Sequence, residues 1–316
     1  MRMIRQVFFK VFKKITHLFT KVGINRKIFG TGRIYDFFYK LFWPYDKVIE
    51  IQGSKMLIDS KDVSPTILET FEGYAKNLVH ERATTKLFKQ VVKEGNMVVD
   101  LGANIGYFTL LAAKLVGENG KVFAFEPEPQ NYSYLKKNIK LNNYNNVETL
   151  QKAVSDRNGK TELYVCSYDT GHHSINQYNG IEAYSRGRHT EKHSIEIETV
   201  ALDSFLEGKT DHVDVIKMDV EGAEALALTG MDGLLRRNEK TKMFIEFFPL
   251  LIEKMGNSPR EFISKLLNDY HFSIYIIPDD YDAQKSEMIK INDVEDVMNL
   301  CKKEESHINL FLKNDQ

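Results

Sequence analysis

Residues 98–115, VVDLGANIGYFTLLAAKL, join an apolar strand-like run, a turn with two glycines and a helical pattern without a break. Glycine accepts backbone conformations that other residues avoid, and it has no Cβ that would block a neighbour. A turn of this composition between a strand and a helix therefore indicates that another group approaches the backbone there. In open α/β sheets, ligands bind beyond the carboxyl ends of the strands, where such turns lie.

The alternation of strand and helix continues downstream of this turn. It predicts βαβ units and a parallel sheet that is covered on both faces. Strands are expected at residues 96–101, 121–127, 147–154, 161–166, 195–200, 213–219, 242–247, 272–278 and 307–313, and helices at 106–116, 129–143, 222–231 and 258–270. Upstream, residues 48–59 alternate like a hairpin or an edge strand, and residues 64–94 are expected to be helical.

The glycine turn differs from a dinucleotide fingerprint, because Gly102 and Gly106 do not complete the pattern GxGxxG. Asp100 lies just before the turn and would point a carboxylate into the cavity, whereas a dinucleotide site must hold a pyrophosphate anion at the helix N-terminus. A cofactor with positive charge and no phosphate fits better. S-adenosylmethionine carries a sulfonium and an ammonium, so the turn favours it over NAD.

A second acidic residue, Glu126, ends the next predicted strand, in VFAFEPEP. A carboxylate at that place can accept hydrogen bonds from the 2′,3′-diol of a ribose. NAD and S-adenosylmethionine both have this diol, so Glu126 alone does not distinguish them. The distinction comes from its combination with Asp100 and the glycine turn.

These segments carry a family resemblance. The stretch from EGNMVVDLGANIG to FEPEPQNYSYLKKNIKLNN, followed by VDVIKMDVEGAEALALTGM and KMFIEFFP, resembles the FkbM family of S-adenosylmethionine-dependent methyltransferases over roughly residues 76–250. HERATTKLF is similar to the family's acidic lead-in. The resemblance implies an α/β, Rossmann-like class I methyltransferase fold with a seven-stranded, mostly parallel sheet and an antiparallel last strand. From the residues before this core we also expect an N-terminal helical extension. It also implies O-methylation of a sugar, glycan or other small metabolite.

The resemblance also implies which residues bind the cofactor. The turn is expected to cradle the methionine part, Asp100 to face its ammonium, Glu126 to hold the ribose, and Ala153 to lie near the adenine. An aromatic face beside a sulfonium would add cation–π attraction, although Phe108 also fits a helix core. The expected cofactor-binding residues are Asp100, Gly102, Ala103, Asn104, Gly106, Tyr107, Phe108, Glu126, Pro127, Ala153 and Asp219.

Three acids at predicted strand ends are candidates for the chemistry: Asp219, Glu221 and Glu246. A hydroxyl that is to be methylated must lose its proton to a positioned base or to a metal that lowers its pKa. These acids can hold a divalent ion, position a base or orient a polyol. Glu221 also precedes a helix, where a carboxylate is favourable without any catalytic role.

Residues 167–194 form a long polar segment with four histidines. A segment of this length in a compact domain is commonly functional or mobile. His172 and His173 are the best candidates for a base, because histidine titrates near neutral pH. The alternative is that both are solvent-exposed loop histidines without a catalytic role. His189 and His193 have helical spacing without an accompanying ligand pattern, so no metal is predicted.

The composition is that of a globular protein with a full core. The 316 residues are 42% hydrophobic and 28% charged, with a net charge of −1. Residues 1–50 differ, with eleven basic, three acidic and twelve aromatic residues. The two cysteines, Cys166 and Cys301, match neither a disulfide framework nor a zinc motif. We expect a basic aromatic extension with helices and a short hairpin over 1–82 and a cofactor-binding domain over 83–316.

Apolar side chains over residues 4–19 recur with helical spacing between lysines. This amphipathic helix either packs on its own domain or contacts a membrane or a partner, with residues 1–22 as the contacting segment. The lysines interrupt every apolar run before a signal peptide can form, and no run approaches the roughly 20 apolar residues of a membrane span. We therefore expect a cytoplasmic protein, peripheral at a membrane if this segment binds one.

Four functions fit these features to different degrees. The first is an S-adenosylmethionine-dependent O-methyltransferase, and the second is an NAD-linked oxidoreductase, against which the absence of GxGxxG argues. The third, a nucleic-acid methyltransferase, is disfavoured because the catalytic half is acidic and MDVEG replaces the motif that flanks a flipped base. The fourth is a non-catalytic, membrane-associated protein that retains the fold. The sequence does not determine the oligomeric state.

Overall fold

The computed structural model of the chain describes residues 8, 11, 14, 47–58, 79–166, 173–175, 193–278, 287–301 and 307–315. The chain divides into two compact units, Met1–Leu78 and Val79–Gln316. In the first unit, strands β1 (Lys47–Ile51) and β2 (Ser54–Ile58) pair antiparallel, which confirms the predicted hairpin.

Most of the predicted N-terminal extension lies outside the described residues. Phe8, Val11 and Lys14 are helical and exposed. The rest of the predicted amphipathic helix lies outside the described residues, and its membrane contact and the domain boundary after residue 82 stay predictions. Among the described residues, no helix is long and apolar enough to cross a membrane.

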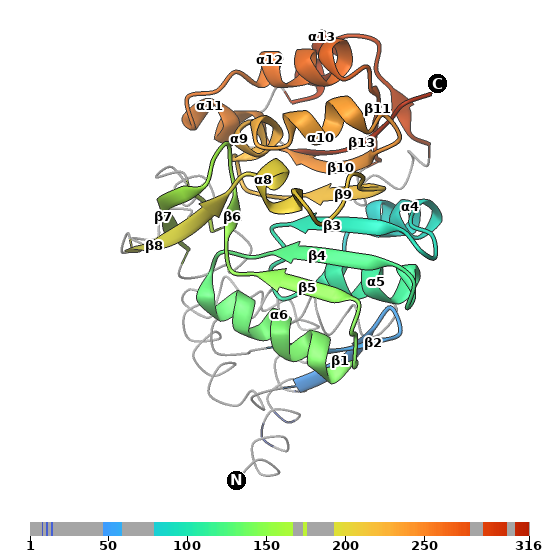
Figure 1. Ribbon diagram of the computed structural model, residues 1–316, viewed down its shortest axis with the longest axis vertical. Helices are drawn as coiled ribbons and strands as arrows, with labels where there is room; N and C mark the ends of the chain where they lie inside the picture. The colour runs from blue at the N-terminus through green and yellow to red at the C-terminus, as the bar shows by residue number, and fades with distance from the viewer. Residues whose placement is uncertain are drawn as a thin grey trace. The chain divides into compact units, whose positions relative to one another are not determined.

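The second unit is built on an eight-stranded sheet in the order β12-β11-β13-β10-β9-β3-β4-β5 (Figure 1). The sheet contains β3 (Met97–Leu101), β4 (Lys121–Phe125), β5 (Val147–Leu150), β9 (Val215–Met218), β10 (Lys242–Phe247), β11 (Ser273–Ile276), β12 (Ile289–Lys290) and β13 (Ile308–Lys313). β13 is antiparallel to both of its neighbours, and the strands from β10 to β5 are parallel. The predicted α/β class and the antiparallel last strand are confirmed. The two-residue β12 adds an eighth, edge strand to the seven that were expected.

Helices precede the first strand of this sheet and lie between its later strands along the chain. They are α4 (Arg82–Val91), α5 (Tyr107–Val116), α6 (Pro129–Leu141), α8 (Leu202–Leu206), α9 (Glu224–Thr229), α10 (Asp232–Arg237), α11 (Pro249–Lys254), α12 (Pro259–Ser264), the π-helical turn η1 (Lys265–Asp269) and α13 (Val294–Leu300). Local chemistry explains where several begin: the Glu128 side chain accepts a hydrogen bond from Asn131 N at the start of α6, and Pro129 occupies its first turn. A capping box at Asp293 starts α13, which the sequence analysis did not predict.

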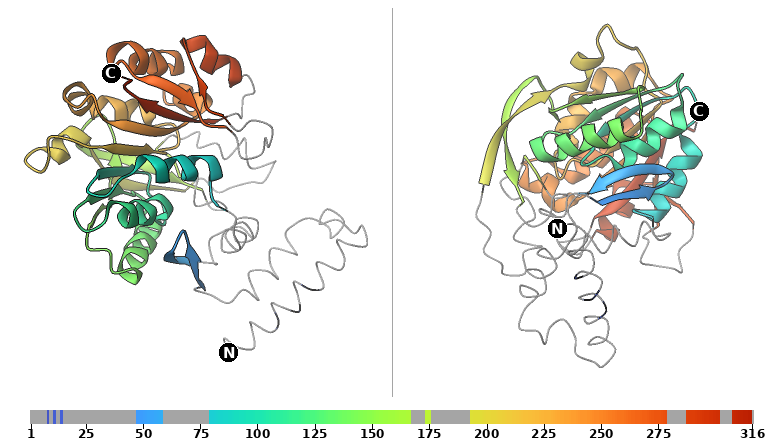
Figure 2. Two further views of the ribbon diagram at one scale, coloured as in Figure 1. Left: turned by 90° about the vertical axis from the view of Figure 1, so that its right-hand side faces the viewer. Right: turned by 90° about the horizontal axis from the view of Figure 1, so that it is seen from below.

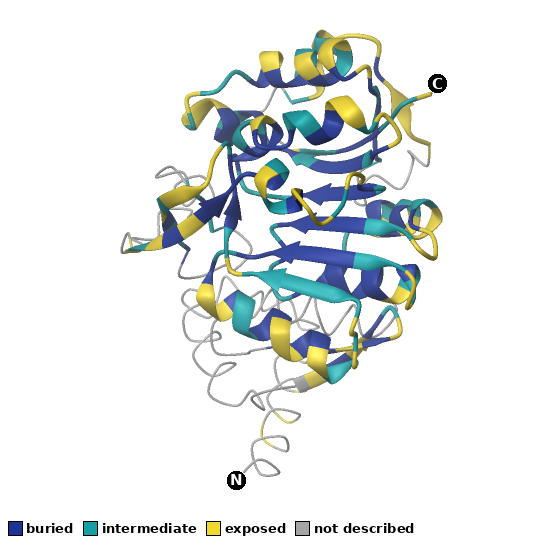
Figure 3. Ribbon diagram, in the orientation of Figure 1, coloured by how far each residue is buried: buried dark blue, intermediate teal, exposed yellow. Residues whose placement is uncertain are grey.

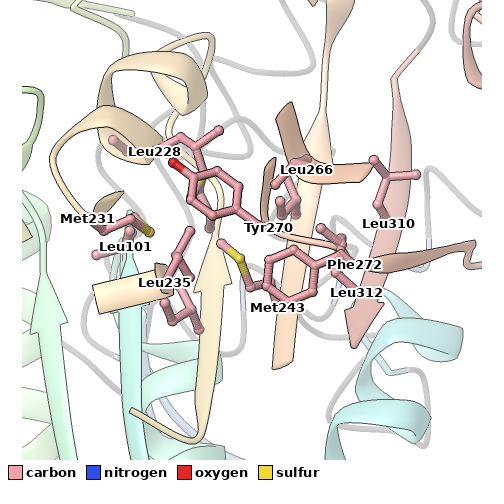
Figure 4. Close-up of a cluster of buried hydrophobic side chains, with 14 of the residues drawn as sticks. Leu101, Leu228, Met231, Leu235, Met243, Leu266, Tyr270, Phe272, Leu310 and Leu312 are labelled. Atoms are coloured by element: carbon pink, nitrogen blue, oxygen red, sulfur yellow. The ribbon is translucent and has the colours of Figure 1, made fainter. Parts of the chain in front are cut away.

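The two faces of the sheet differ in chemistry. One face is apolar: side chains such as Leu101 and Met243 join residues of α9, α10 and η1 in the main core (Figure 4). Alternate residues point to the other face, where the Phe88 ring of α4 packs 5.3 Å from the rings of Phe108 in α5 and Phe244 in β10. Figure 3 shows that the central strands are buried. Polar groups on the second face are therefore shielded from water by α4 and α5.

A second, three-stranded sheet comprises β6 (Ala153–Val154), β8 (His193–Val200) and β7 (Gly159–Val165) in that order. β7 and β8 form a long ribbon that extends away from the central sheet (Figures 1 and 2). The single strand that was predicted over 147–154 is wrong, because β5 belongs to the central sheet and β6 to this one. Each half pairs in a different sheet, β5 with β4 and β6 with β8, and nothing in the sequence pattern marks the bend between them.

Candidate functional site

The turn after β3 is held against the end of β9 by a glycine. Gly102 has a φ of +80°, and a Cβ at this position would lie 1.8 Å from the backbone oxygen of Asp219. Gly106 has a φ of +105°, and its Cβ would meet the Leu135 side chain at 2.8 Å. The groups that approach these glycines are therefore parts of the protein itself. This contact brings the carboxyl ends of β3 and β9 to one place.

The backbone N–H groups of the turn, residues 102–106, all donate hydrogen bonds to acceptors within the protein. Asn104 N donates to Glu126 Oε2 at 2.8 Å, which ties the turn to the end of β4. The other four bonds run from Gly102 N and Ala103 N to Phe125 O, from Ile105 N to Asn104 Oδ1, and from Gly106 N to Ala103 O. A pyrophosphate bound at a helix N-terminus needs such N–H groups as donors. This turn has none left to offer.

The Glu126 carboxylate is buried at the end of β4, with 5% of the residue exposed. Its second oxygen, Oε1, accepts a hydrogen bond from Glu128 N at 2.9 Å. Burial raises the pKa of Glu126 to about 8, against the lowering effect of these two backbone bonds. Each carboxylate oxygen has two acceptor sites, so both can accept a further bond from a hydroxyl. The position suits the ribose contact that the sequence predicted.

Asp100 lies one residue before the end of β3 and is 3% exposed. Its Oδ2 accepts a hydrogen bond from Thr109 Oγ1 at 2.5 Å, which connects the strand to α5. Burial raises the pKa of Asp100 to about 6, opposed by the Thr109 bond and by the charge of Lys217. The observed contacts of Asp100 are thus inside the domain, and its contact with a methionine ammonium stays a prediction.

Lys217 is directly opposite Asp100, in the neighbouring strand β9. It is 2% exposed, with its Nζ 3.5 Å from Asp219 Oδ2, 4.0 Å from Glu81 Oε1 and 5.0 Å from the centre of the Phe108 ring. Burial by itself would lower the pKa of Lys217, but the charges of neighbouring acids outweigh it and raise the pKa. These acids are Glu81, Asp219, Glu246 and Asp100. One buried ammonium thus balances several carboxylates on the second face of the sheet.

Two of the predicted catalytic acids lie together at the ends of β9 and β10. Asp219 and Glu246 are partly exposed, 31% and 25% by side chain. Partial burial, then the charge of Asp219, raises the pKa of Glu246 well above its ordinary value. Glu246 also contacts His307, whose Nε2 atom lies 3.2 Å from Glu246 Oε1. Asp219, Glu246 and His307 therefore form a connected group at the edge of the sheet.

The third predicted acid, Glu221, lies in the turn between β9 and α9. It has a φ of +49°, and its backbone oxygen accepts a hydrogen bond from Ser174 Oγ at 2.6 Å. The next residue, Gly222, has a φ of +98°, and a Cβ there would meet Leu251 at 2.8 Å. Glu224 starts α9 and is 1% exposed. The turn is thus anchored on both sides, from Ser174 and from α11.

Glu224→Gln is expected to stabilise the protein at pH 8 and to change its stability little at pH 5. Burial raises the pKa of Glu224 to about 8, so the folded state holds a proton that the unfolded state loses as the pH rises from about 4.5 to 8, and wild-type stability falls over that window. Glutamine keeps an oxygen that can accept from Gly222 N, as Glu224 Oε1 does. We expect a gain of roughly 1–3 kcal/mol at pH 8.

Urea unfolding at both pH values measures this effect. The exposed Glu253→Gln in α11 is the matched control, because it removes the same charge without relieving burial. An equal shift for Glu224→Gln at pH 5 and pH 8 would show that packing, and not proton binding, is responsible.

Other predicted cofactor residues have contacts of their own. Tyr107 OH lies 3.2 Å from Thr85 Oγ1, and Phe108 packs on Phe88 beneath Lys217. Ala153 is buried in β6, in a small cluster with Leu163 and Ile197. Pro127 is half-buried after β4, and Ala103 is 4% exposed. Cofactor contacts for all these residues stay predictions.

The predicted base candidates are only partly described. His172 lies outside the described residues. His173 Nδ1 accepts a hydrogen bond from Cys166 N at 3.0 Å, so one ring nitrogen is engaged with the backbone at the end of β7. Within the ranges that the structure describes, no group of three or more acidic, histidine or cysteine side chains is arranged to hold a metal ion.

Sequence reasoning assigned no role to Lys217, Glu81, Thr109 or His307. Glu81 lies in HERATTKLF, the segment that resembles the family's acidic lead-in. Its backbone has a left-handed φ of +41° at the start of α4. A lysine inside the apolar strand VDVIKMD was the signal for Lys217, because a charged residue in a buried strand requires a partner. His307 directly precedes the last strand and had no local signal.

A family model described as Methyltransferase FkbM domain matches residues 100–274. The chain is 31% identical over 156 residues to Methyltransferase sdnD of Sordaria araneosa, covering 43% of this chain and 60% of that protein. It is 26% identical over 205 residues to Hexuronic acid methyltransferase AglP of Haloferax volcanii, covering 64% and 73%. The chain spans about three fifths of the length of the first two curated relatives.

A crystal structure of Methyltransferase FkbM from Methylobacillus flagellatus also aligns with the chain. The two are 13% identical, with a TM-score of 0.38, over 78% of this chain and 59% of that chain.

Proposed function

The chain belongs to the FkbM methyltransferase family, and we propose that it transfers the methyl group of S-adenosylmethionine to an oxygen of a sugar, glycan or other small hydroxylated metabolite. The observation that carries this proposal is the glycine turn. Its five N–H groups are satisfied within the protein, while carboxylates occupy the strand ends around it. Such a site repels a pyrophosphate and suits a cationic ligand.

The residues present fit S-adenosylmethionine. Glu126 offers free acceptor positions at the end of β4 for the ribose diol, and its carboxylate is held in place by Asn104 N and Glu128 N. Asp219, at 31% side-chain exposure, presents negative charge at the end of the adjacent strand β9. An ammonium and a sulfonium are both favoured beside such carboxylates.

Bound S-adenosylmethionine would supply an activated methyl group on sulfur, which needs no further activation by the protein. The protein's part is then to bind the two reactants, align the acceptor oxygen and remove its proton. Asp219 and Glu246 lie at neighbouring strand ends, where an acceptor next to the cofactor would be reached. Their carboxyl groups can also accept hydrogen bonds from the hydroxyls of a sugar.

A sugar acceptor has some support from the comparisons. The relative from Haloferax volcanii, 26% identical over 205 residues, is described as a hexuronic acid methyltransferase. An acidic site is a poor match for a nucleic-acid backbone, because each phosphate would be repelled. We therefore propose a small-molecule or glycan acceptor and no nucleic acid.

Glu126→Ala is expected to weaken S-adenosylmethionine binding by about twofold to tenfold at pH 7, where a pKa of about 8 keeps the carboxyl group mostly protonated. A hydrogen bond between neutral groups contributes about 0.5–1.5 kcal/mol. Titration calorimetry with S-adenosylmethionine measures this on the full chain. Glu118→Ala, an exposed position after α5, is the control and should bind as the wild type does. Wild-type protein that binds NAD and not S-adenosylmethionine would contradict the proposed cofactor.

Transfer of a radiolabelled methyl group to defined acceptors tests the reaction itself. The panel should contain glucuronic and galacturonic acids, their glycosides, neutral sugars, and a tRNA preparation as the competing class. We expect label on a sugar oxygen, identified by mass spectrometry of the product. Label on nitrogen, carbon or RNA would overturn the proposed acceptor class. A chain that binds the cofactor but transfers no methyl group to any acceptor of this panel or of a cell extract would favour a non-catalytic role.

A further inference from the structure

We infer that His307 is the base that takes the proton of the acceptor hydroxyl, and that Glu246 holds its imidazole in the orientation this requires. The inference rests on the proposed O-methyl transfer and names a catalytic residue for it. It differs from the expectation from sequence, which placed the base among the histidines of residues 167–194.

The fold brings His307 to the site edge. β13 runs antiparallel to β10, and its first residue, Ile308, is opposite Phe247, the last residue of β10. His307 therefore lies at the carboxyl end of β10, the same edge at which β3, β4 and β9 end. Its ring centre is 5.9 Å from that of Phe248. The residue is 45% exposed by side chain, so the ring is accessible to a ligand.

Two carboxyl groups in contact with each other lie on one side of this ring. His307 Nε2 lies 3.2 Å from Glu246 Oε1, and Glu246 in turn shares a hydrogen bond with Asp219. An oxygen acceptor at Nε2 favours the tautomer in which Nε2 carries the hydrogen, which leaves Nδ1 as the free acceptor. This is the arrangement of a histidine base with a carboxyl group as its positioning partner.

The other candidate bases near the strand ends are less suited to accept the proton of the acceptor hydroxyl. Asp219 lies 3.5 Å from the buried ammonium of Lys217 and also interacts with Glu246, so both acids already have partners within the protein. His173 Nδ1 is occupied by Cys166 N. His80 is similar, because its Nε2 lies 3.3 Å from Glu81 Oε1 and its side chain is 42% exposed. His307 differs in that its partner, Glu246, is itself in contact with Asp219 at the carboxyl ends of β10 and β9.

The proton transfer balances with the methyl transfer. As the acceptor oxygen forms a bond to the methyl carbon, the carbon–sulfur bond breaks and its electron pair stays on sulfur, which becomes a neutral thioether. The hydroxyl proton passes to His307 Nδ1, and the resulting imidazolium is stabilised by Glu246 and Asp219. The proton then leaves to solvent from the exposed ring. No additional reactant is required.

A spectroscopic experiment tests the arrangement without any acceptor. The imidazole ¹⁵N shifts of the full chain are measured with bound S-adenosylhomocysteine, and His307→Ala assigns the signal. We expect the Nε2–H tautomer in the wild type and its loss as the dominant form in Glu246→Ala. Glu246→Gln should keep it, because the amide oxygen is also an acceptor. A wild-type ring protonated on Nδ1, or one that does not respond to Glu246→Ala, would overturn the inference.

Kinetics on a hydroxyl acceptor tests the chemical role. His307→Ala should lower kcat by about 100-fold to 10,000-fold, the usual contribution of a general base, with cofactor affinity unchanged and partial recovery on adding imidazole. Glu246→Gln should retain more activity than Glu246→Ala. The exposed His212→Ala, before β9 at the opposite edge, should match the wild type. Unchanged kcat in His307→Ala would overturn the inference, whereas a wild type without transfer would contradict the proposed function and leave the spectroscopic result to decide the arrangement.

Discussion

Gly102→Ala is expected to destabilise the second unit by about 2–5 kcal/mol and to abolish S-adenosylmethionine binding. The new Cβ would be placed 1.8 Å from the backbone oxygen of Asp219, and a backbone atom cannot rotate away as a side-chain end does. Left-handed φ costs about 1–2 kcal/mol for alanine, and overpacking adds about 1–3 kcal/mol. Urea unfolding and titration calorimetry measure the two effects. The loss of binding follows because the strand ends of β3 and β9 must separate to make room.

Gly95→Ala is the matched control for this prediction. Gly95 has the same φ of +80°, but a Cβ there has no heavy atom within 4 Å. It therefore carries the cost of the backbone conformation without the clash, and we expect about 1–2 kcal/mol and unchanged binding. Equal losses in the two variants would show that backbone strain alone, and not contact with β9, makes glycine necessary at residue 102.

Lys217→Met is expected to lower stability by about 3–5 kcal/mol at pH 8, the usual cost of removing one partner from a buried ionic group. Methionine fills a similar volume, but Asp100 and Glu81 would then face each other and the other acids without the Nζ cation. The penalty should be smaller at pH 5, because Asp100, with a pKa of about 6, then holds a proton in the folded state. Urea midpoints at the two pH values measure this difference.

Two further variants separate charge from packing. Glu81→Gln in the Lys217→Met background should recover part of the stability at pH 8, because it removes one of the uncompensated charges. Lys240→Met, at an exposed residue before β10, should have little effect at either pH. A loss for Lys217→Met that is the same at pH 5 and pH 8, with no recovery by Glu81→Gln, would mean that Lys217 acts through its packing on Phe108.

The sequence alone predicted the class of fold because its signals are local. A buried strand, a turn with Gly102 and Gly106, and a helix each leave a pattern within a few residues. The alternation of such patterns allows few arrangements other than a parallel sheet. Glu126 was placed at a strand end in the same way, and its tie to the glycine turn agrees with that position. The split between β5 and β6 had no such pattern, whereas helix α13 had a local signal, its capping box at Asp293, that the sequence analysis did not use.

Only the tertiary structure decided which residues meet at the site. Lys217 faces Asp100 because β9 lies beside β3 in that register, and His307 reaches Glu246 because β13 returns antiparallel between β10 and β11. These residues are separated by tens of positions along the chain, so no local period connects them. Local sequence determines backbone conformation within each element, whereas strand order and register arise when distant apolar faces are buried together. The sequence by itself therefore determined the parallel α/β fold and its glycine turn. The packing of the sheet decided which acids surround Lys217 and that His307 lies beside Glu246.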